Sequence, residues 1–104
     1  MHYVVLGVHS AEVCPTSNAK TRALMLEMVP KIPKIAEQKG VQIIAGPFVN
    51  REHTTVVIVE TDKAEKLDEF LNETRLPQWN SLRVIPSLHL QEGFRDIEAG
   101  NSLF

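Results

Sequence analysis

The stretch TTVVIVE at residues 54–60 decides the fold. β-Branched residues fill nearly all of it, as is typical of a strand inside a sheet. Side chains alternate between the two faces of a strand, so Val57 and Val59 share one face while Val56 and Ile58 share the other. Both faces are apolar, and the sequence therefore predicts a central strand that is covered on both sides.

The chain downstream of this strand predicts a helix and a last strand. Asp62 and Glu65 have the spacing of a capping box, and apolar residues recur at helical intervals over residues 63–74. Residues 82–90, LRVIPSLHL, have the composition of a strand. Pro86 favours the edge of a sheet, because it has no backbone N–H to donate to a neighbouring strand.

Two further strands are expected upstream. Residues 2–9, HYVVLGVH, form a short apolar run that is too short for a helix and is typical of a buried strand. Like the strand at 54–60, it is apolar on both faces. Residues 41–49, VQIIAGPFV, predict another strand, in which Pro47 favours an edge position or a bulge.

Residues 17–39 show helical periodicity, with apolar side chains at three- and four-residue steps. Pro30 and Pro33 interrupt the pattern, because each removes an N–H donor and clashes with the preceding turn. We expect a kinked helix or two helices, the second starting near Pro30. Gly40 is suited to end the second.

The order strand, helix, strand, strand, helix, strand is that of the ferredoxin-like βαββαβ arrangement. Right-handed crossovers place the first and third strands in the centre and the second and fourth at the edges. We therefore predict an α+β domain over residues 1–90, with an antiparallel four-stranded sheet and two helices on one face. Residues 91–104 form a C-terminal tail with a short helix around 93–99.

Two helices cover only one face of this sheet, although both faces of its central strands are apolar. Soluble monomers avoid an exposed apolar patch of that size. We therefore expect a second copy of the chain to cover the other face, giving a homodimer that closes into an α+β barrel. The barrel interior is the natural place for a small-molecule ligand, and the tail could contribute to the dimer interface.

The opening HYVVLGV, the strand TTVVIVETD running directly into a helix, and the final strand RVIPSLHL carry a resemblance. With these segments the chain resembles the dimeric α+β barrel superfamily, especially its small stand-alone GYD-type and related uncharacterised members. The resemblance covers the layout of residues 2–90 and implies the fold and the dimer. It implies no single function, because the superfamily includes cofactor-free monooxygenases, isomerases, haem-dependent enzymes, sensing domains and metal-binding proteins.

Composition excludes several classes of protein. The chain has 104 residues, a net charge of −2, four histidines and one cysteine. A single domain is expected at this length, and one cysteine cannot form an internal disulfide. The near-neutral charge argues against nucleic acid as a partner, and no apolar run reaches the ~20 residues of a membrane span. Without a recognisable signal peptide, we expect a cytoplasmic protein with a reduced thiol.

Three residues form the first candidate metal site. Antiparallel pairing of the strands at 2–9 and 54–60 brings His9 near His53, with Cys14 in the loop that leaves the first strand. Two imidazoles and a thiol suit zinc, copper or nickel. The alternative is a surface histidine at each strand end and a buried thiol. Cys14 precedes an expected helix N-terminus, which would lower the pKa of its thiol and also suit haem ligation.

A second candidate cluster lies at the opposite end of the predicted sheet. His89 ends the last strand and comes near His2, and Glu60 ends the strand at 54–60. His2, Glu60 and His89 could bind a metal or act as a general acid–base pair. Strand parity leaves open whether His2 and Glu60 point to the same face.

Three other residues are candidates for binding an organic ligand or cofactor. Tyr3 and Trp79 could line an apolar pocket, with Trp79 at its rim. Arg83 could bind a carboxylate or phosphate if it faces the barrel interior. The alternatives are packing for the aromatic residues and a surface position for the arginine.

The sequence leaves three functions open. The first is binding of a metal or small ligand by a homodimer, at the histidines and Cys14. The second is a small monooxygenase- or isomerase-like enzyme that acts on an apolar metabolite in the barrel interior. The third is a non-catalytic module whose exposed sheet edge pairs with another protein.

Overall fold

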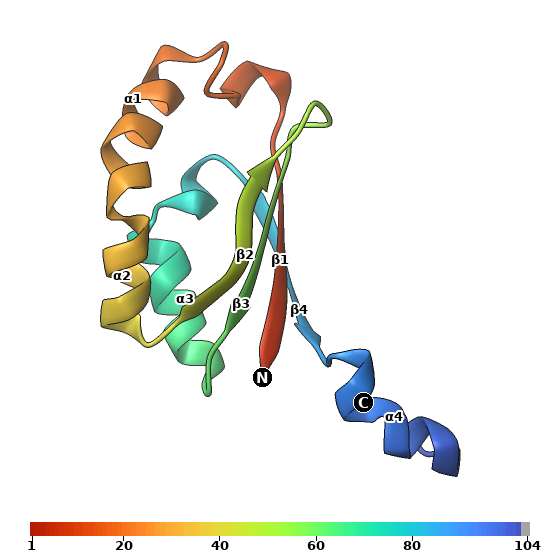
Figure 1. The fold of residues 1–104 in the computed structure, drawn as a ribbon. Helices are drawn as coiled ribbons and strands as arrows, with labels where there is room; N and C mark the ends of the chain where they lie inside the picture. The colour runs from red at the N-terminus through yellow and green to blue at the C-terminus, as the bar shows by residue number, and fades with distance from the viewer. Residues whose placement is uncertain (103–104) are drawn as a thin grey trace.

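The computed structural model describes residues 1–102, so the last two residues of the expected tail lie outside the described part (Figure 1). The chain folds into an α+β structure. Its four strands are β1 (His2–Val8), β2 (Gln42–Val49), β3 (Thr54–Glu60) and β4 (Ser81–Ser87). Its α-helices within the described residues are α1 (Ala19–Met28), α2 (Ile32–Lys39), α3 (Ala64–Glu73) and α4 (Leu90–Ala99). Short 3-10 turns are η1 (Ala11–Val13), η2 (Val29–Lys31) and η3 (Leu76–Gln78).

The strands form one antiparallel sheet in the order β2-β3-β1-β4. This order has the two predicted central strands in the middle and the two proline-containing strands at the edges. In the register, Val5 lies opposite both Val57 of β3 and Val84 of β4. Irregular pairing interrupts β2 between Ile43 and Phe48, the stretch that contains Pro47. A proline is tolerated there because an edge strand with a bulge leaves backbone groups unpaired.

The helical region upstream of β2 consists of two helices, as the prolines predicted. Helix α1 ends at Met28, and Pro30 lies in the turn η2 before α2 begins. Pro33 is accommodated in the first turn of α2, where a backbone N–H has no helical partner in any case. Gly40 ends α2 with a φ of 70°, a left-handed conformation that glycine adopts without strain.

Two local predictions were wrong. The last strand ends at Ser87 rather than at residue 90, and His89 instead caps α4. Asp62 does not cap α3: the residue before the helix is Lys63, which makes no side-chain capping bond. The Asp62 carboxylate instead lies 2.8 Å from the Lys66 ammonium. An ion pair of this spacing competes successfully with a capping bond because both groups lie at the surface and reach each other one helical turn apart.

The hydrophobic core lies between the sheet and helices α1, α2 and α3, which cover the same face (Figure 1). Three helices therefore cover this face instead of the two predicted, because Pro30 divides the first helical region. Its largest fully buried side chains are Val5, Val57, Val59, Leu67 and Phe70. Each of them contributes roughly 1.5–3 kcal/mol by leaving water. The strands β1 and β3 supply the sheet side of this core with every second residue, as the alternation predicted.

The other face of the sheet carries apolar side chains that these helices do not cover. Val4, Val56 and Ile58 are half-buried, and Phe48 on β2 is 56% exposed. Helix α4 extends away from the end of β4 (Figure 1). The radius of gyration is accordingly 15.5 Å, against about 13 Å for a compact domain of this length. Among residues 1–102, none of the helices combines the length and the apolar character needed to span a bilayer.

Candidate metal centre

The structure brings His9, Cys14 and His53 together. One potential ligand atom from each residue lies within 4.8 Å of the other two. His9 follows β1, His53 precedes β3, and Cys14 lies in the loop after η1. The backbone N–H of His9 donates to the His53 carbonyl at 3.1 Å, which extends the β1–β3 pairing by one bond. Antiparallel pairing therefore places the two imidazoles at the same end of the sheet, as predicted.

The loop around Cys14 is held by hydrogen bonds from two sides. The Cys14 carbonyl accepts the backbone N–H groups of Ser17 at 3.0 Å and Asn18 at 2.8 Å. The guanidinium of Arg22 on α1 donates to the carbonyls of Pro15 and Thr16, both at 3.0 Å. These two bonds from Arg22 hold the loop against α1, and the buried Cys14 side chain faces the two histidines.

A shifted pKa distinguishes the Cys14 thiol. Hydrogen bonding by the Thr16 hydroxyl, 3.1 Å from the sulfur, is the main cause that lowers the pKa of Cys14 below its ordinary value. The Thr16 backbone N–H and the nearby His53 lower it further, while burial raises it. The expected cause was the helix N-terminus, but α1 begins only at Ala19, with Asn18 as its cap. Hydrogen bonds from Thr16, rather than a helix dipole, are therefore the main cause of the lowered pKa of Cys14.

The orientation of His9 is set by a buried amide. His9 Nδ1 lies 3.0 Å from the Oδ1 atom of Asn80, and Asn80 Nδ2 donates to the Leu76 carbonyl at 3.3 Å. Because the amide nitrogen donates to a carbonyl, Oδ1 faces the imidazole and accepts a hydrogen bond from the Nδ1–H group of His9. Nε2 of His9 then carries the free lone pair and is the atom that can bind a metal. The ring also packs against Trp79, with centroids 4.9 Å apart.

A tight turn presents His53. Its φ of 57° is left-handed, a region that histidine enters more readily than most residues. The Asn50 side chain accepts the backbone N–H groups of Glu52 at 2.9 Å and Thr54 at 3.3 Å and so holds the turn on both sides of His53. The rings of His53 and His9 meet edge to face, with centroids 5.4 Å apart.

The donor set suits a small transition-metal ion. Zinc bonds of about 2.3 Å to sulfur and 2.0 Å to nitrogen place tetrahedral ligands about 3.4 Å apart. The three atoms lie within 4.8 Å of one another, so each pair needs to approach by at most about 1.4 Å. Two histidines and one cysteine also form the trigonal set of copper electron-transfer sites. With three protein ligands, a zinc ion would keep its fourth coordination position for a solvent or substrate ligand.

The second predicted cluster does not form as expected. His2 and Glu60 are directly opposite in the β1–β3 register, so they share a face, and their side chains lie 3.7 Å apart. His89, however, is drawn into the start of α4, where its Nδ1 accepts the backbone N–H of Gln91 at 3.2 Å. Glu92 of α4 takes its place beside His2, at 3.9 Å. The contacts of the His2 imidazole with these two carboxylates link α4 to the sheet.

The residues predicted to bind an organic ligand are not brought together. Tyr3 and Trp79 are buried in the core between the sheet and the helices. Arg83 lies opposite Leu6 in the register and is exposed on the other face of the sheet. Within one chain, Tyr3 and Arg83 therefore cannot line the same pocket, because successive side chains of a strand alternate between faces.

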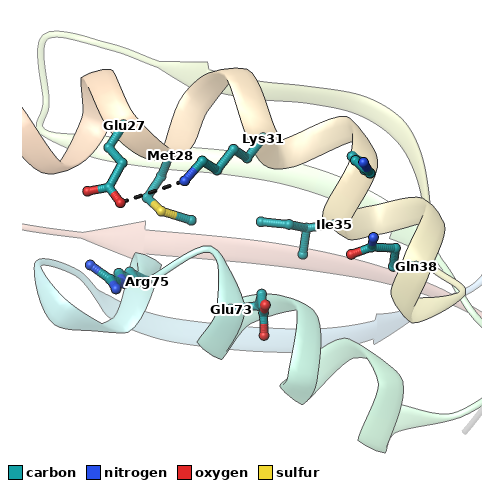
Figure 2. Close-up of a pocket in the computed structure, with 8 residues that line it drawn as sticks. Glu27, Met28, Lys31, Ile35, Gln38, Glu73 and Arg75 are labelled. Atoms are coloured by element: carbon teal, nitrogen blue, oxygen red, sulfur yellow. Dashed lines mark ion pairs between the residues drawn. The ribbon is translucent and has the colours of Figure 1, made fainter.

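A charged groove that sequence reasoning missed runs between α1–α2 and α3. Figure 2 shows Lys31 reaching toward Glu27, with which it forms an ion pair at 3.7 Å, and Arg75 and Glu73 on the opposite wall. The groove has a volume of about 450 Å³. Because its charges are of both signs, it favours neither an anionic nor a cationic ligand.

Sequence reasoning also missed the residues that support the metal cluster. Asn80 orients His9, Arg22 braces the Cys14 loop, and Thr16 activates the thiol. Each acts through a contact with a loop whose shape no local pattern reveals. Comparison of the chain with protein-family models and with curated proteins gives no match.

Proposed function

We propose that this protein binds a transition-metal ion, zinc or copper, through Nε2 of His9, the Cys14 thiolate and an imidazole nitrogen of His53. The observation that carries the proposal is the convergence of three donor atoms within 4.8 Å. Two further residues adjust the ligand groups. Asn80 sets the His9 tautomer, and Thr16 lowers the pKa of the Cys14 thiol. Such outer contacts are typical of metal sites, because they fix ligand orientation and basicity.

A small ion fits the cluster better than haem. Both imidazoles lie close to the sulfur, where they would meet a porphyrin plane bound to that thiolate. An ion held by the same three residues needs no such space. A free thiol stays reduced most readily in the cytoplasm, and the proposal places the protein there.

The functional unit that we propose is a homodimer of ferredoxin-like protomers, related to the dimeric α+β barrels. Two features support it: the apolar sheet face with Val4, Val56 and Ile58, and the projecting helix α4. Leu90, Phe94 and Ile97 of α4 recur at helical spacing and are 67%, 53% and 44% exposed. A helix of ten residues is marginal in water unless its apolar side packs against another surface.

The area of the sheet face is too small for a stable dimer interface unless α4 contributes to it. A four-stranded face with strands of seven residues measures roughly 23 by 19 Å, or about 440 Å². A stable interface buries about 800 Å² on each partner. The helix of one copy, packed across the other copy, supplies the additional area, so the proposal assigns α4 to the dimer interface.

Metal analysis of protein purified without an affinity tag tests the binding proposal. We expect stoichiometric metal, or stoichiometric uptake of added Zn²⁺ or Cu²⁺, in the wild type. His53→Asn removes the imidazole but suits the left-handed turn, so the loss of binding will not come from backbone strain. His89→Asn is the matched control, because asparagine can still cap α4. Equal metal content in these two variants would rule the site out.

Light scattering tests the dimer. We expect two chains per particle in the wild type and one in Phe94→Glu, which places a charge in the proposed contact. Glu98→Gln on the same helix is the control and should remain dimeric. A monomeric wild type at micromolar concentration would contradict the dimer while leaving the metal site untouched.

A further inference from the structure

The structure contains an apolar cavity that the proposed metal site does not use. It has a volume of about 350 Å³ and lies between the first two helices and the strands β2 and β3. Its walls include Met25, Ile32, Ile43 and Trp79. No charged side chain lines it within the described residues. Cavities of this size and character are typical of small-molecule sites.

One polar atom in this wall has no partner. Thr55 is 5% exposed, and its hydroxyl makes no hydrogen bond with any of the described residues. Thr74 lines the same cavity, but its hydroxyl has a partner, because it donates to the Leu71 carbonyl at 3.0 Å. A buried hydroxyl without a partner is costly. The Thr55 oxygen has almost no accessible surface, so a ligand in the cavity reaches it only when the neighbouring wall side chains shift, and the hydrogen bond then formed removes that cost.

We propose that this cavity binds a small, neutral, largely apolar molecule that carries a single hydroxyl or carbonyl group. The polar group bonds the Thr55 hydroxyl, and the remainder packs against the methionine and aliphatic side chains. Carboxylates and phosphates are excluded, because the lining offers no cation to balance their charge. The ligand lies against Trp79, and the Trp79 ring also packs against the imidazole of His9. The cavity and the proposed metal cluster therefore share the Trp79 side chain as a common wall.

The fluorescence of Trp79, the one tryptophan of the chain, reports on the cavity directly. The probes are cyclohexanol and methylcyclohexane, which have similar size but differ in the hydroxyl. Titrations are carried out in the presence of a chelator, so that a failure of the metal proposal does not affect the result. We expect cyclohexanol to change the Trp79 emission saturably and to bind more tightly than methylcyclohexane, by between about twofold and tenfold for one hydrogen bond.

Thr55→Val keeps the shape of the side chain but removes the hydroxyl. We expect it to abolish the preference for cyclohexanol and to raise the melting temperature, because an unpartnered polar group is lost. Thr54→Val, the adjacent residue on the other face of the sheet, is the matched control and should keep the preference. Equal binding of the two probes by the wild type would mean that water alone completes Thr55 and would overturn the proposal. Saturable binding of neither probe would overturn it as well.

Discussion

The imidazole of His9 and the amide of Asn80 lie 71 positions apart in the chain, yet His9 Nδ1 and Asn80 Oδ1 are 3.0 Å apart. The bond connects the end of β1 to the residue just before β4, which is hydrogen-bonded to β1 as its neighbour in the sheet. It assigns the proton to Nδ1 and leaves Nε2 free to bind a metal. The proposed metal binding thus depends on a residue that is not itself one of the three proposed ligands.

Replacing Asn80 with leucine tests this dependence. We expect Zn²⁺ affinity to fall by about 10–100-fold, as for other outer contacts to ligating histidines. Stability should fall by about 1–3 kcal/mol, because the His9 and Leu76 partners of the amide lose their bonds. Competitive titration against a chromophoric chelator and urea unfolding measure the two effects. Asn72→Leu, on the exposed side of α3, is the control, and an equal loss of affinity there would contradict the assigned role.

Gly7 is predicted to matter because it makes room for Asn80. A Cβ atom at Gly7 would lie 3.0 Å from Asn80 Oδ1 and 3.1 Å from Leu82 Cδ2, which is closer than ordinary packing. Gly7→Ala should therefore displace the amide and weaken both metal binding and stability. In the Asn80→Ala background much of the clash is gone, so the same substitution should cost less. A double-mutant cycle measures the difference, and additive effects would show that the contact is unimportant.

Arg22→Lys should lower metal affinity while leaving the fold intact. Lysine keeps the charge but cannot bond the carbonyls of Pro15 and Thr16 at once, as the planar guanidinium does. Without both bonds the loop around Cys14 has more conformational freedom in the metal-free protein, and metal binding then costs more conformational entropy. Lys20→Arg, on the same helix, is the control. Calorimetric Zn²⁺ titration should show a less favourable entropy for Arg22→Lys, and unchanged binding would exclude the loop from the site.

Thr16→Val should raise the pKa of the Cys14 thiol toward its ordinary value, because the hydroxyl that stabilises the thiolate is lost. At a fixed pH below that pKa, the thiolate fraction falls, so protons compete better with the metal. The affinity deficit should accordingly grow as the pH is lowered. The rise of thiolate absorbance with pH in metal-free protein measures the pKa. Thr16→Ser keeps a hydroxyl and should resemble the wild type.

Asp62 carries a small part of the acid sensitivity of folding. Lys66 holds the pKa of the Asp62 carboxyl below its ordinary value. The stabilisation is present at pH values above the unfolded pKa, about 3.9, and is lost as the pH falls through the lower folded pKa. Asp62→Asn should therefore narrow the stability difference between pH 7 and pH 3, and added salt should weaken the effect. Asp68→Asn is the control, measured by thermal unfolding at both pH values.

Local patterns predicted the elements well because their causes are local. The β-branched run at 54–60 forms β3 over that range, and Pro30 divides the helical region where its missing N–H requires. The two incorrect local predictions involve surface polar groups with several partners in reach. Asp62 pairs with a lysine rather than with a backbone N–H, and His89 caps a helix rather than ending a strand.

The candidate site was predictable only in part. Antiparallel pairing of two recognisable strands was enough to place His9 beside His53, and Cys14 followed from its short distance along the chain. Asn80, Arg22 and Thr16 were not predictable, because their roles depend on where loop carbonyls and side-chain amides point. The unpartnered hydroxyl of Thr55 was likewise hidden, since alternation predicts burial but not the absence of an acceptor.

The sequence by itself determined the order of strands and helices, the division of the first helical region at Pro30 and the two-sided apolar character of β1 and β3, since backbone preference and periodicity act over a few residues. Tertiary structure alone decided which side chains converge. The β1–β3 register aligns His2 with Glu60, and α4 removes His89 from them. The pairing of β4 with β1 brings Asn80 beside His9. Such contacts join residues far apart in the chain, and only the packed arrangement of the whole sheet and its helices specifies them.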